Sequence, residues 1–472
     1  MDSSSPPDPA GDEGVQKMDG GINALYSFLV AKAPCRAFLV SQTPPTLPAL
    51  RVYRFGEALT VLFPTGCLKG REGSGEQQVS VLIGSCRYEN NLHCPRLSLL
   101  KGFSTLTLSV KQLSRLLRFS DLLPSSLPSP CPTVAASQVP ALFREPYILS
   151  GYRPVQQDWR CYLLSLFQRH NETLNVWTHL LAAPALLLLW WANVGALGYT
   201  LDAASLPLAL FMVSSLTYLC LSVAAHLLQS HSERAHYYFF FLDYVGVAVY
   251  QYGCSLSHYF YSSEPAWRDS IGMMFLPGAA FFGWLSCAGC CFAKARYRRP
   301  YPLQRKICQL IPTSLAYALD ISPIAHRLLT IPWSQETSLP FHALQIASFI
   351  LSAFFFSCPV PERFFPGRCD FVGQGHQVFH LFLSLCTVFQ LEALFLDYAR
   401  RRDAVRDVFG ERQLWWACVS FPCLFMCCVL TALIAMRHMS KILQHVSHQT
   451  RLKSSTSLSL KANGSSYSTC GI

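Results

Sequence analysis

Three histidines are spaced so that they could bind one metal ion. His226 lies near the end of one long apolar segment, and His376 and His380 lie four residues apart at the start of another. Residues four apart share one face of an α-helix, and three neutral imidazoles leave the fourth position of a tetrahedral zinc ion open. The pattern predicts a zinc site formed by His226, His376 and His380. The alternative is three histidines that only pack between helices.

Two other polar side chains are predicted to lie beside this site. Ser222 precedes His226 by one helical turn, and Asp243 lies about two turns into the next apolar segment. Either side chain could hold a water on the metal or orient a ligand. If the protein is a hydrolase, Asp243 and Ser222 are its candidate catalytic residues, with Asp243 relaying a proton.

Several more polar residues lie within apolar segments, where ionisable groups are costly and usually functional. For these, a structural hydrogen bond and a contact with a ligand both remain open. They are His258, Gln251, Asp320, His326 and Glu392. His179, which follows Asn171, Glu172 and Asn175, is interpreted as a structural residue at the membrane interface.

Eight apolar segments of about 20 residues must position these side chains. An α-helix of that length crosses a hydrocarbon core of about 30 Å. The chain is 51% hydrophobic and only 14% charged, whereas soluble proteins average about 25% charged residues. The sequence therefore predicts an all-α, polytopic membrane helix bundle. The predicted spans are 176–198, 207–228, 237–261, 271–293, 308–329, 341–360, 376–397 and 414–436.

Loop charges predict that both termini are cytoplasmic, because cytoplasmic loops are rich in lysine and arginine. The connection at 294–306 holds six cations, whereas three of the four loops predicted on the opposite side, 199–206, 262–270 and 331–340, together hold only Arg268. This orientation places the three histidines at one depth, near the cytoplasmic face. The last connection contradicts it, since it carries Arg400, Arg401, Arg402, Arg406 and Arg412. The net charge of +11 belongs to such loops and to the tail, so nucleic acid is not an expected partner.

The chain is divided into four parts by composition. Residues 1–103 are rich in Pro, Gly and Ser and are expected to form an atypical, mostly disordered extension. Residues 104–170 form a cytoplasmic amphipathic and linker segment, in which leucines between 106 and 117 suggest a short helix. Residues 171–436 form the transmembrane helix bundle, and residues 437–472 form a basic, Ser/Thr-rich cytoplasmic tail.

Four segments resemble the three motifs of the progestin and adipoQ receptor family. They are His170-Asn-Glu-Thr-Leu-Asn-Val-Trp-Thr-His179, the spacing from Ser222 to His226, Asp243-Tyr-Val-Gly246 and Gly375-His-Gln-Val-Phe-His380. The resemblance spans about residues 140–436 and, within the family, extends to the membrane progestin receptor group. Residues 1–103 depart from the family pattern.

The resemblance implies seven family-core transmembrane helices, to which this sequence adds an eighth. It implies a plasma-membrane receptor for progesterone and related steroids that signals rapidly through a G-protein pathway, with a role in oocyte maturation. In the adiponectin-receptor branch the corresponding histidines hold zinc, and that branch is linked to ceramide hydrolysis. The alternative function is therefore a zinc-dependent lipid amide hydrolase, similar to a ceramidase.

Overall fold

A computed structural model describes residues 52–55, 58–61, 78–82, 105–109, 130–197, 199–299 and 301–464. Side chains are described from residue 130 onward, except at 196, 197 and 450–464. The chain divides into two compact units, residues 1–78 and 79–472. The residues described before position 110 form four short strands: β1 (Val52–Phe55), antiparallel to β2 (Ala58–Val61), and β3 (Gln78–Leu82), paired with β4 (Thr105–Ser109).

The strand β4 corrects one prediction. The leucines between 106 and 117 suggest a helix, but Thr105–Ser109 is extended and pairs with β3. The alternation of Thr and Leu in this strand fits a two-residue β repeat better than a helical one. Residues 110–117 lie outside the described part of the chain.

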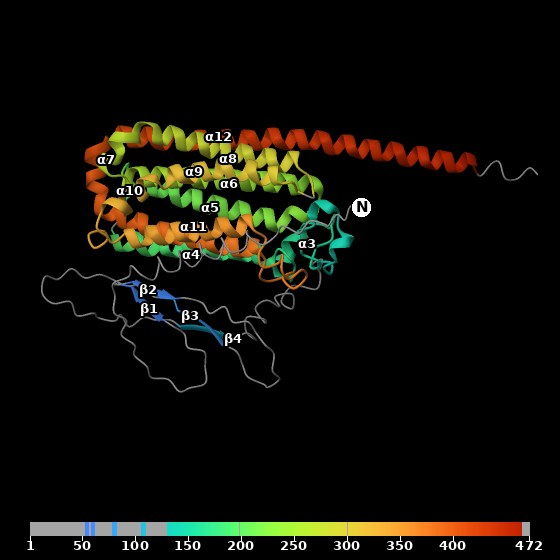
Figure 1. The fold of residues 1–472 in the computed structure, drawn as a ribbon, viewed down its shortest axis with the longest axis horizontal. Coiled ribbons are helices and arrows are strands. Elements are labelled where there is room, and N and C mark those ends of the chain that lie inside the picture. Colours follow the sequence, from blue (N-terminus) through green and yellow to red (C-terminus); the bar gives the residue numbers. More distant parts are fainter. Residues whose placement is uncertain are drawn as a thin grey trace, which may run out of the picture. The chain divides into compact units, whose positions relative to one another are not determined.

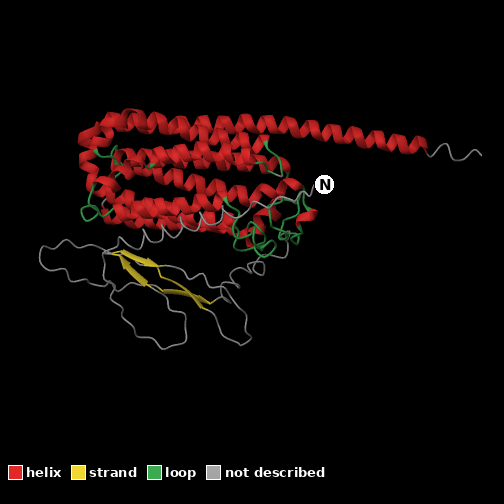
Figure 2. Cartoon of the chain, in the orientation of Figure 1, coloured by secondary structure: helices red, strands yellow, loops and turns green. Residues whose placement is uncertain are grey.

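The region from residue 130 to 464 is a bundle of long helices that lie side by side (Figure 1, Figure 2). Its α-helices are α3 (Trp159–Leu164), α4 (Thr173–Leu197), α5 (Leu206–Leu228), α6 (Glu233–Ser257), α7 (Pro265–Trp267), α8 (Met273–Arg296), α9 (Leu303–Asp320), α10 (Ser322–Thr330), α11 (Leu339–Ser357) and α12 (Gly375–Gly464). A π-helical turn, η6 (His258–Ser262), continues α6. This arrangement confirms the predicted all-α membrane bundle.

Length and hydropathy identify the helices that could cross a membrane. Among the described residues five helices qualify, or six if the bent pair α9 and α10 is one span. The five are Thr173–Gly195, Leu206–His231, Pro265–Arg296, Leu339–Ser357 and Gly375–Gln449. The last is 75 residues long and is interrupted at Gly410. A multi-pass membrane protein is confirmed, whereas the count of eight spans remains a prediction.

One predicted span differs in shape from the expectation. The predicted span 308–329 is not one straight helix, since α9 and α10 meet at an angle of 46° around Ile321. Pro323 explains the break, because proline lacks the N–H that would continue the helix and clashes with the preceding turn.

The last connection is helical rather than a loop. Helical structure continues through the arginine-rich residues 400–409 and is interrupted at Gly410, with φ of 69° and ψ of 152°. A positive φ is readily adopted only by glycine. Figure 1 shows the orange part of α12 before this residue and the red part after it on different sides of the bundle.

Glycines on α6 allow it to approach α5 closely. A Cβ atom on Gly246 would lie 2.9 Å from the Cα of Tyr218, and one on Gly253 would overlap the side chain of Ser214. Larger residues at these positions would push the two helices apart. The close contact brings Asp243 on α6 toward His226 on α5.

Candidate metal centre

Helices α5 and α12 bring the three predicted metal ligands together. His226 is in the last turn of α5, and His376 and His380 are in the first two turns of α12. One nitrogen from each ring lies within 4.8 Å of the others. His226 and His380 are buried and His376 is half-buried. Among the described residues this is the group that could hold a metal ion.

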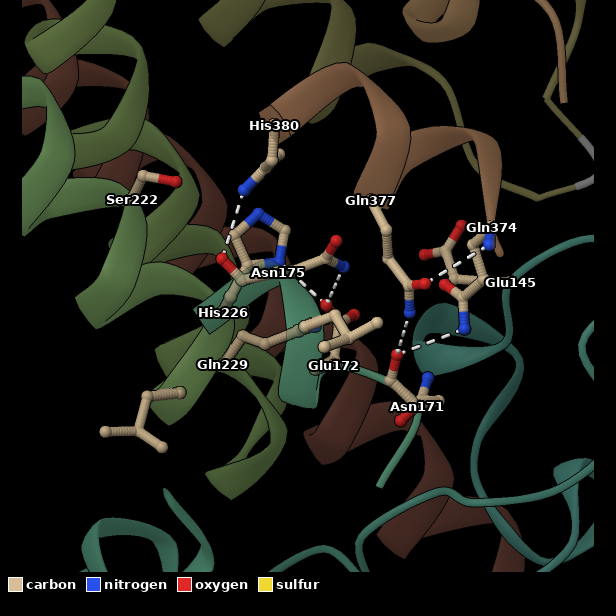
Figure 3. Close-up of polar contacts among 12 residues, drawn as sticks. Glu145, Asn171, Glu172, Asn175, Ser222, His226, Gln229, Gln374, Gln377 and His380 are labelled. Atoms are coloured by element: carbon tan, nitrogen blue, oxygen red, sulfur yellow. Dashed lines mark hydrogen bonds and ion pairs between the residues drawn. The ribbon is translucent and has the colours of Figure 1, made fainter. Parts of the chain in front are cut away.

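The hydrogen bonds of two rings fit metal binding. His226 Nδ1 lies 2.7 Å from Glu172 Oε2, and His380 Nδ1 lies 3.1 Å from the carbonyl oxygen of Asn175 (Figure 3). Both Nδ1 atoms therefore donate, which leaves the Nε2 lone pairs free for a metal. A tetrahedral zinc with Zn–N bonds of about 2.0–2.1 Å would place its nitrogens about 3.3 Å apart. The nitrogens lie up to 4.8 Å apart, so the rings would have to move closer together to bind the ion.

Ser222 contacts the cluster through another histidine. Its hydroxyl lies 2.9 Å from Nδ1 of His179, and the His179 ring stacks on His380 with centroids 3.9 Å apart. The interpretation of His179 as a structural residue at the membrane interface did not foresee this contact with the cluster, and the interfacial depth remains a prediction. His179 is 1% exposed and forms one wall of the histidine cluster.

Asp243 lies beside the cluster on α6. It is half-buried and within electrostatic range of His226 and of Lys294. The ammonium of Lys294 lies 3.8 Å above the ring of Phe240. A carboxylate in this position could accept a proton or orient a polar ligand group near the histidines.

Glu172 is the residue that the sequence interpretation missed. Its Oε2 accepts from His226 and from Asn175 Nδ2 at 2.6 Å, and its Oε1 accepts from Gln229 Nε2 at 2.9 Å. Burial raises the pKa of this carboxyl, but the charge and hydrogen bond of His226 and the hydrogen bond of Asn175 leave the pKa below its ordinary value. One signal was available: positions 172, 175 and 179 have the spacing of a single helix face.

A buried arginine, Arg153, holds the segment that precedes α3 against the end of α5. Arg153 donates to the carbonyl oxygens of His226 at 2.8 Å and Leu227 at 2.5 Å, and to Ser165 Oγ at 2.9 Å. These carbonyls belong to the last turn of α5, which lacks helical partners and favours cations. Burial lowers the pKa of Arg153 to about 10. The guanidinium stays charged at neutral pH and fixes the segment over this end of the bundle.

The start of α12 is tied to the same segment. Gln374 Nε2 donates to the carbonyl oxygen of Asn171 at 3.1 Å (Figure 3). Asp370 accepts from the backbone N–H of Leu149 at 2.8 Å and from Ser150 Oγ at 2.6 Å. The turn before α4 therefore contacts both helices that carry the histidines.

Most of the other polar residues within apolar segments have protein partners. His258 Nδ1 lies 3.0 Å from Asp320 Oδ1, and its Nε2 accepts from Gln390 at 3.1 Å. Glu392 accepts from Asn193, and Gln251 donates to the carbonyl of Thr313, both at 3.5 Å. These contacts favour structural roles for four of the five residues whose role was left open. The fifth is His326, whose Nδ1 is buried without a hydrogen-bond partner among the described residues.

These features define a multi-pass membrane protein with a buried cluster of histidines between two helices. The model of the family described as "Haemolysin-III related" matches residues 167–391, which include every histidine of the cluster. The chain belongs to this family, which is the progestin and adipoQ receptor family indicated by its motifs.

Several relatives are similar along nearly their whole length. The membrane progestin receptor beta of Mus musculus is 55% identical over 349 residues, which cover 73% of this chain and 97% of that protein. The protein of the same name in Homo sapiens matches with the same identity and coverage. The membrane progestin receptor alpha of Sus scrofa is 53% identical over 281 residues, covering 59% of this chain and 80% of that protein.

Proposed function

We propose that this protein is a plasma-membrane receptor for progesterone and related steroids. The observation that carries the proposal is the identity of 55% to membrane progestin receptors beta over 97% of their length. Within the membrane progestin receptor group, the sequence also resembles the beta subtype most closely. Rapid signalling through a heterotrimeric G protein, with a role in oocyte maturation, is the part of the proposal that follows from the family resemblance.

The proposal includes a zinc ion held by His226, His376 and His380. Two of these rings already direct Nδ1 to an oxygen acceptor, which supports coordination through Nε2. Bound zinc would supply a cross-link between helices and a Lewis acid. The ion would link α5, through His226, to α12, through the other two histidines, within electrostatic range of Asp243 on α6.

The alternative function is a zinc-dependent lipid amide hydrolase similar to a ceramidase. The carboxylate of Asp243 beside the cluster favours it, because such a group could take up a proton from an attacking water. Ser222 is less suited to this role, since its hydroxyl is engaged by His179. We favour the receptor, because a lipid amide substrate is indicated by neither the motifs nor the names of the relatives.

The purified protein distinguishes the two functions. We expect saturable binding of labelled progesterone and no zinc-dependent release of fatty acid from ceramide. Asp243→Asn should keep steroid affinity within about a factor of ten, which is about 1.4 kcal/mol, because the substitution keeps the shape of the side chain. Ceramide turnover that requires zinc and is lost in Asp243→Asn would establish the hydrolase instead.

Both termini are proposed to face the cytoplasm. Three of the five arginines that contradicted this orientation have close acidic partners in the fold: Arg401 contacts Glu264 at 2.7 Å and Glu336 at 3.1 Å, and Arg402 and Arg406 contact Asp202 at 2.5 and 2.8 Å. Their presence is explained by these ion pairs, whichever side they face.

Glycosylation tests this orientation. Asn463-Gly-Ser465 is an acceptor sequence, and a cytoplasmic tail would hide it from the glycosylation machinery. We expect no glycosidase-sensitive change in mass in the wild type or in Asn463→Gln. Asn171-Glu-Thr173 is uninformative, because Asn171 is buried. A shift that disappears in Asn463→Gln would place the tail outside the cell.

A further inference from the structure

We propose that Glu172 is the positioning residue of the metal centre, and that its carboxylate aims the Nε2 atom of His226 at the ion. This inference rests on the zinc site of the proposed function and adds a residue outside the three ligands. Glu172 lies 54 positions before His226 in the chain and directly before α4.

The contact between the two side chains is close and sealed from solvent. Glu172 Oε2 and His226 Nδ1 are 2.7 Å apart, and the side chains are 7% and 4% exposed. A ring nitrogen that faces a carboxylate carries the proton, so the other nitrogen presents its lone pair. Carboxylate partners of this kind fix the tautomer and orientation of metal-binding histidines and raise their basicity.

The carboxylate is itself held in place by hydrogen bonds from α4 and from the turn that follows α5. Asn175 on α4 donates to Oε2, and Gln229, just after α5, donates to Oε1. The amide oxygen of Gln229 in turn lies 2.6 Å from Nδ1 of His236 on α6. These linked hydrogen bonds hold the Glu172 carboxylate in one orientation, so the plane of the His226 ring is fixed before any ion binds.

The same turn also orients His380, a second candidate metal ligand. The carbonyl oxygen of Asn175 accepts from His380 Nδ1 at 3.1 Å. Residues 172–175 therefore orient one histidine from each of the two helices that form the site. Glu172 provides the charged acceptor and Asn175 the neutral one, so removal of the Glu172 charge should have the larger effect on metal affinity.

The test is a graded series of variants measured for metal binding alone. Zinc affinity is determined for the purified full chain by competition with a chelator. Glu172→Gln should bind zinc about 10–100-fold more weakly than wild type. Gln229→Leu should weaken binding less, because it removes only one support of the carboxylate. Glu145→Gln is the matched control, since Glu145 is a neighbouring carboxylate that pairs with Arg299 instead.

A second measurement separates positioning from a purely structural role. Cobalt(II) is bound in place of zinc, because its visible absorption reports the arrangement of its ligands. Glu172→Gln should change this spectrum while the zinc-free variant keeps the thermal stability of the zinc-free wild type. If Glu172→Gln keeps wild-type zinc affinity and the cobalt spectrum, or if its only change is lower stability, the positioning role is overturned and the metal site stands. Failure of the wild type to bind zinc would overturn both.

Discussion

Replacing His376 by alanine is expected to remove nearly all of the zinc from the purified protein. The site draws one ligand from α5 and two from α12, and the loss of one imidazole leaves two donors for an ion that requires at least three protein ligands in such sites. Zinc content, measured by elemental analysis, should fall from about one ion per chain to a small fraction. Affinity should fall by orders of magnitude.

Two histidines serve as controls for this substitution. His258 is fully buried in the bundle, but both of its ring nitrogens have partners in Asp320 and Gln390, so His258→Ala should keep zinc. His438 is exposed on α12 itself, and His438→Ala should also have no effect. Stoichiometric zinc in His376→Ala, or its absence from the wild type, would refute the metal site.

Replacing Asp397 by alanine is expected to cause the largest loss of stability. Arg327 is fully buried, and its Nη1 and Nη2 contact the two oxygens of Asp397 at 2.6 and 3.1 Å. The same carboxylate accepts from His342 at 2.9 Å and from Ser262 at 2.6 Å. It therefore joins α10, α11, η6 and α12. Without Asp397, the buried guanidinium of Arg327 keeps only its longer ion-pair contacts with Glu336 at 3.2 Å and Glu264 at 3.5 Å. Breaking a buried ion pair costs about 3–5 kcal/mol.

The measurement is thermal unfolding in one detergent at a fixed protein concentration. Asp202→Ala is the matched control, because Asp202 also binds arginines but is more exposed, and exposed ion pairs contribute about 0–1 kcal/mol. The double variant Arg327→Met, Asp397→Leu should lose less than Asp397→Ala, since it leaves fewer unpaired charges. Equal melting temperatures for Asp397→Ala and Asp202→Ala would contradict this account.

The sequence determined the class of fold and the three central histidines. The length of an apolar segment identifies a membrane helix, because a chain in lipid must satisfy its backbone hydrogen bonds internally. The same rule fixes the depth of a side chain within its span. His226 and His376 could therefore be placed in one layer before any contact between α5 and α12 was known.

Local sequence did not determine where the helices break. The predicted loop before the last span is helical up to Gly410, and the predicted fifth span is bent at Ile321. Both differences arise because hydropathy reports only how apolar or charged a segment is. Whether a helix continues or bends depends instead on backbone geometry. The arginines at 400–406 could remain helical since carboxylates from other segments pair with them.

The partners of the polar groups were decided by the tertiary structure alone. Glu172 meets His226, Ser222 meets His179 and Asp397 meets Arg327. Spacing within one helix predicts which residues share a face, but the neighbour across that face depends on how the helices pack. The sequence thus determined which side chains could bind a metal, and the packing of α4, α5 and α12 decided which carboxylate would orient them.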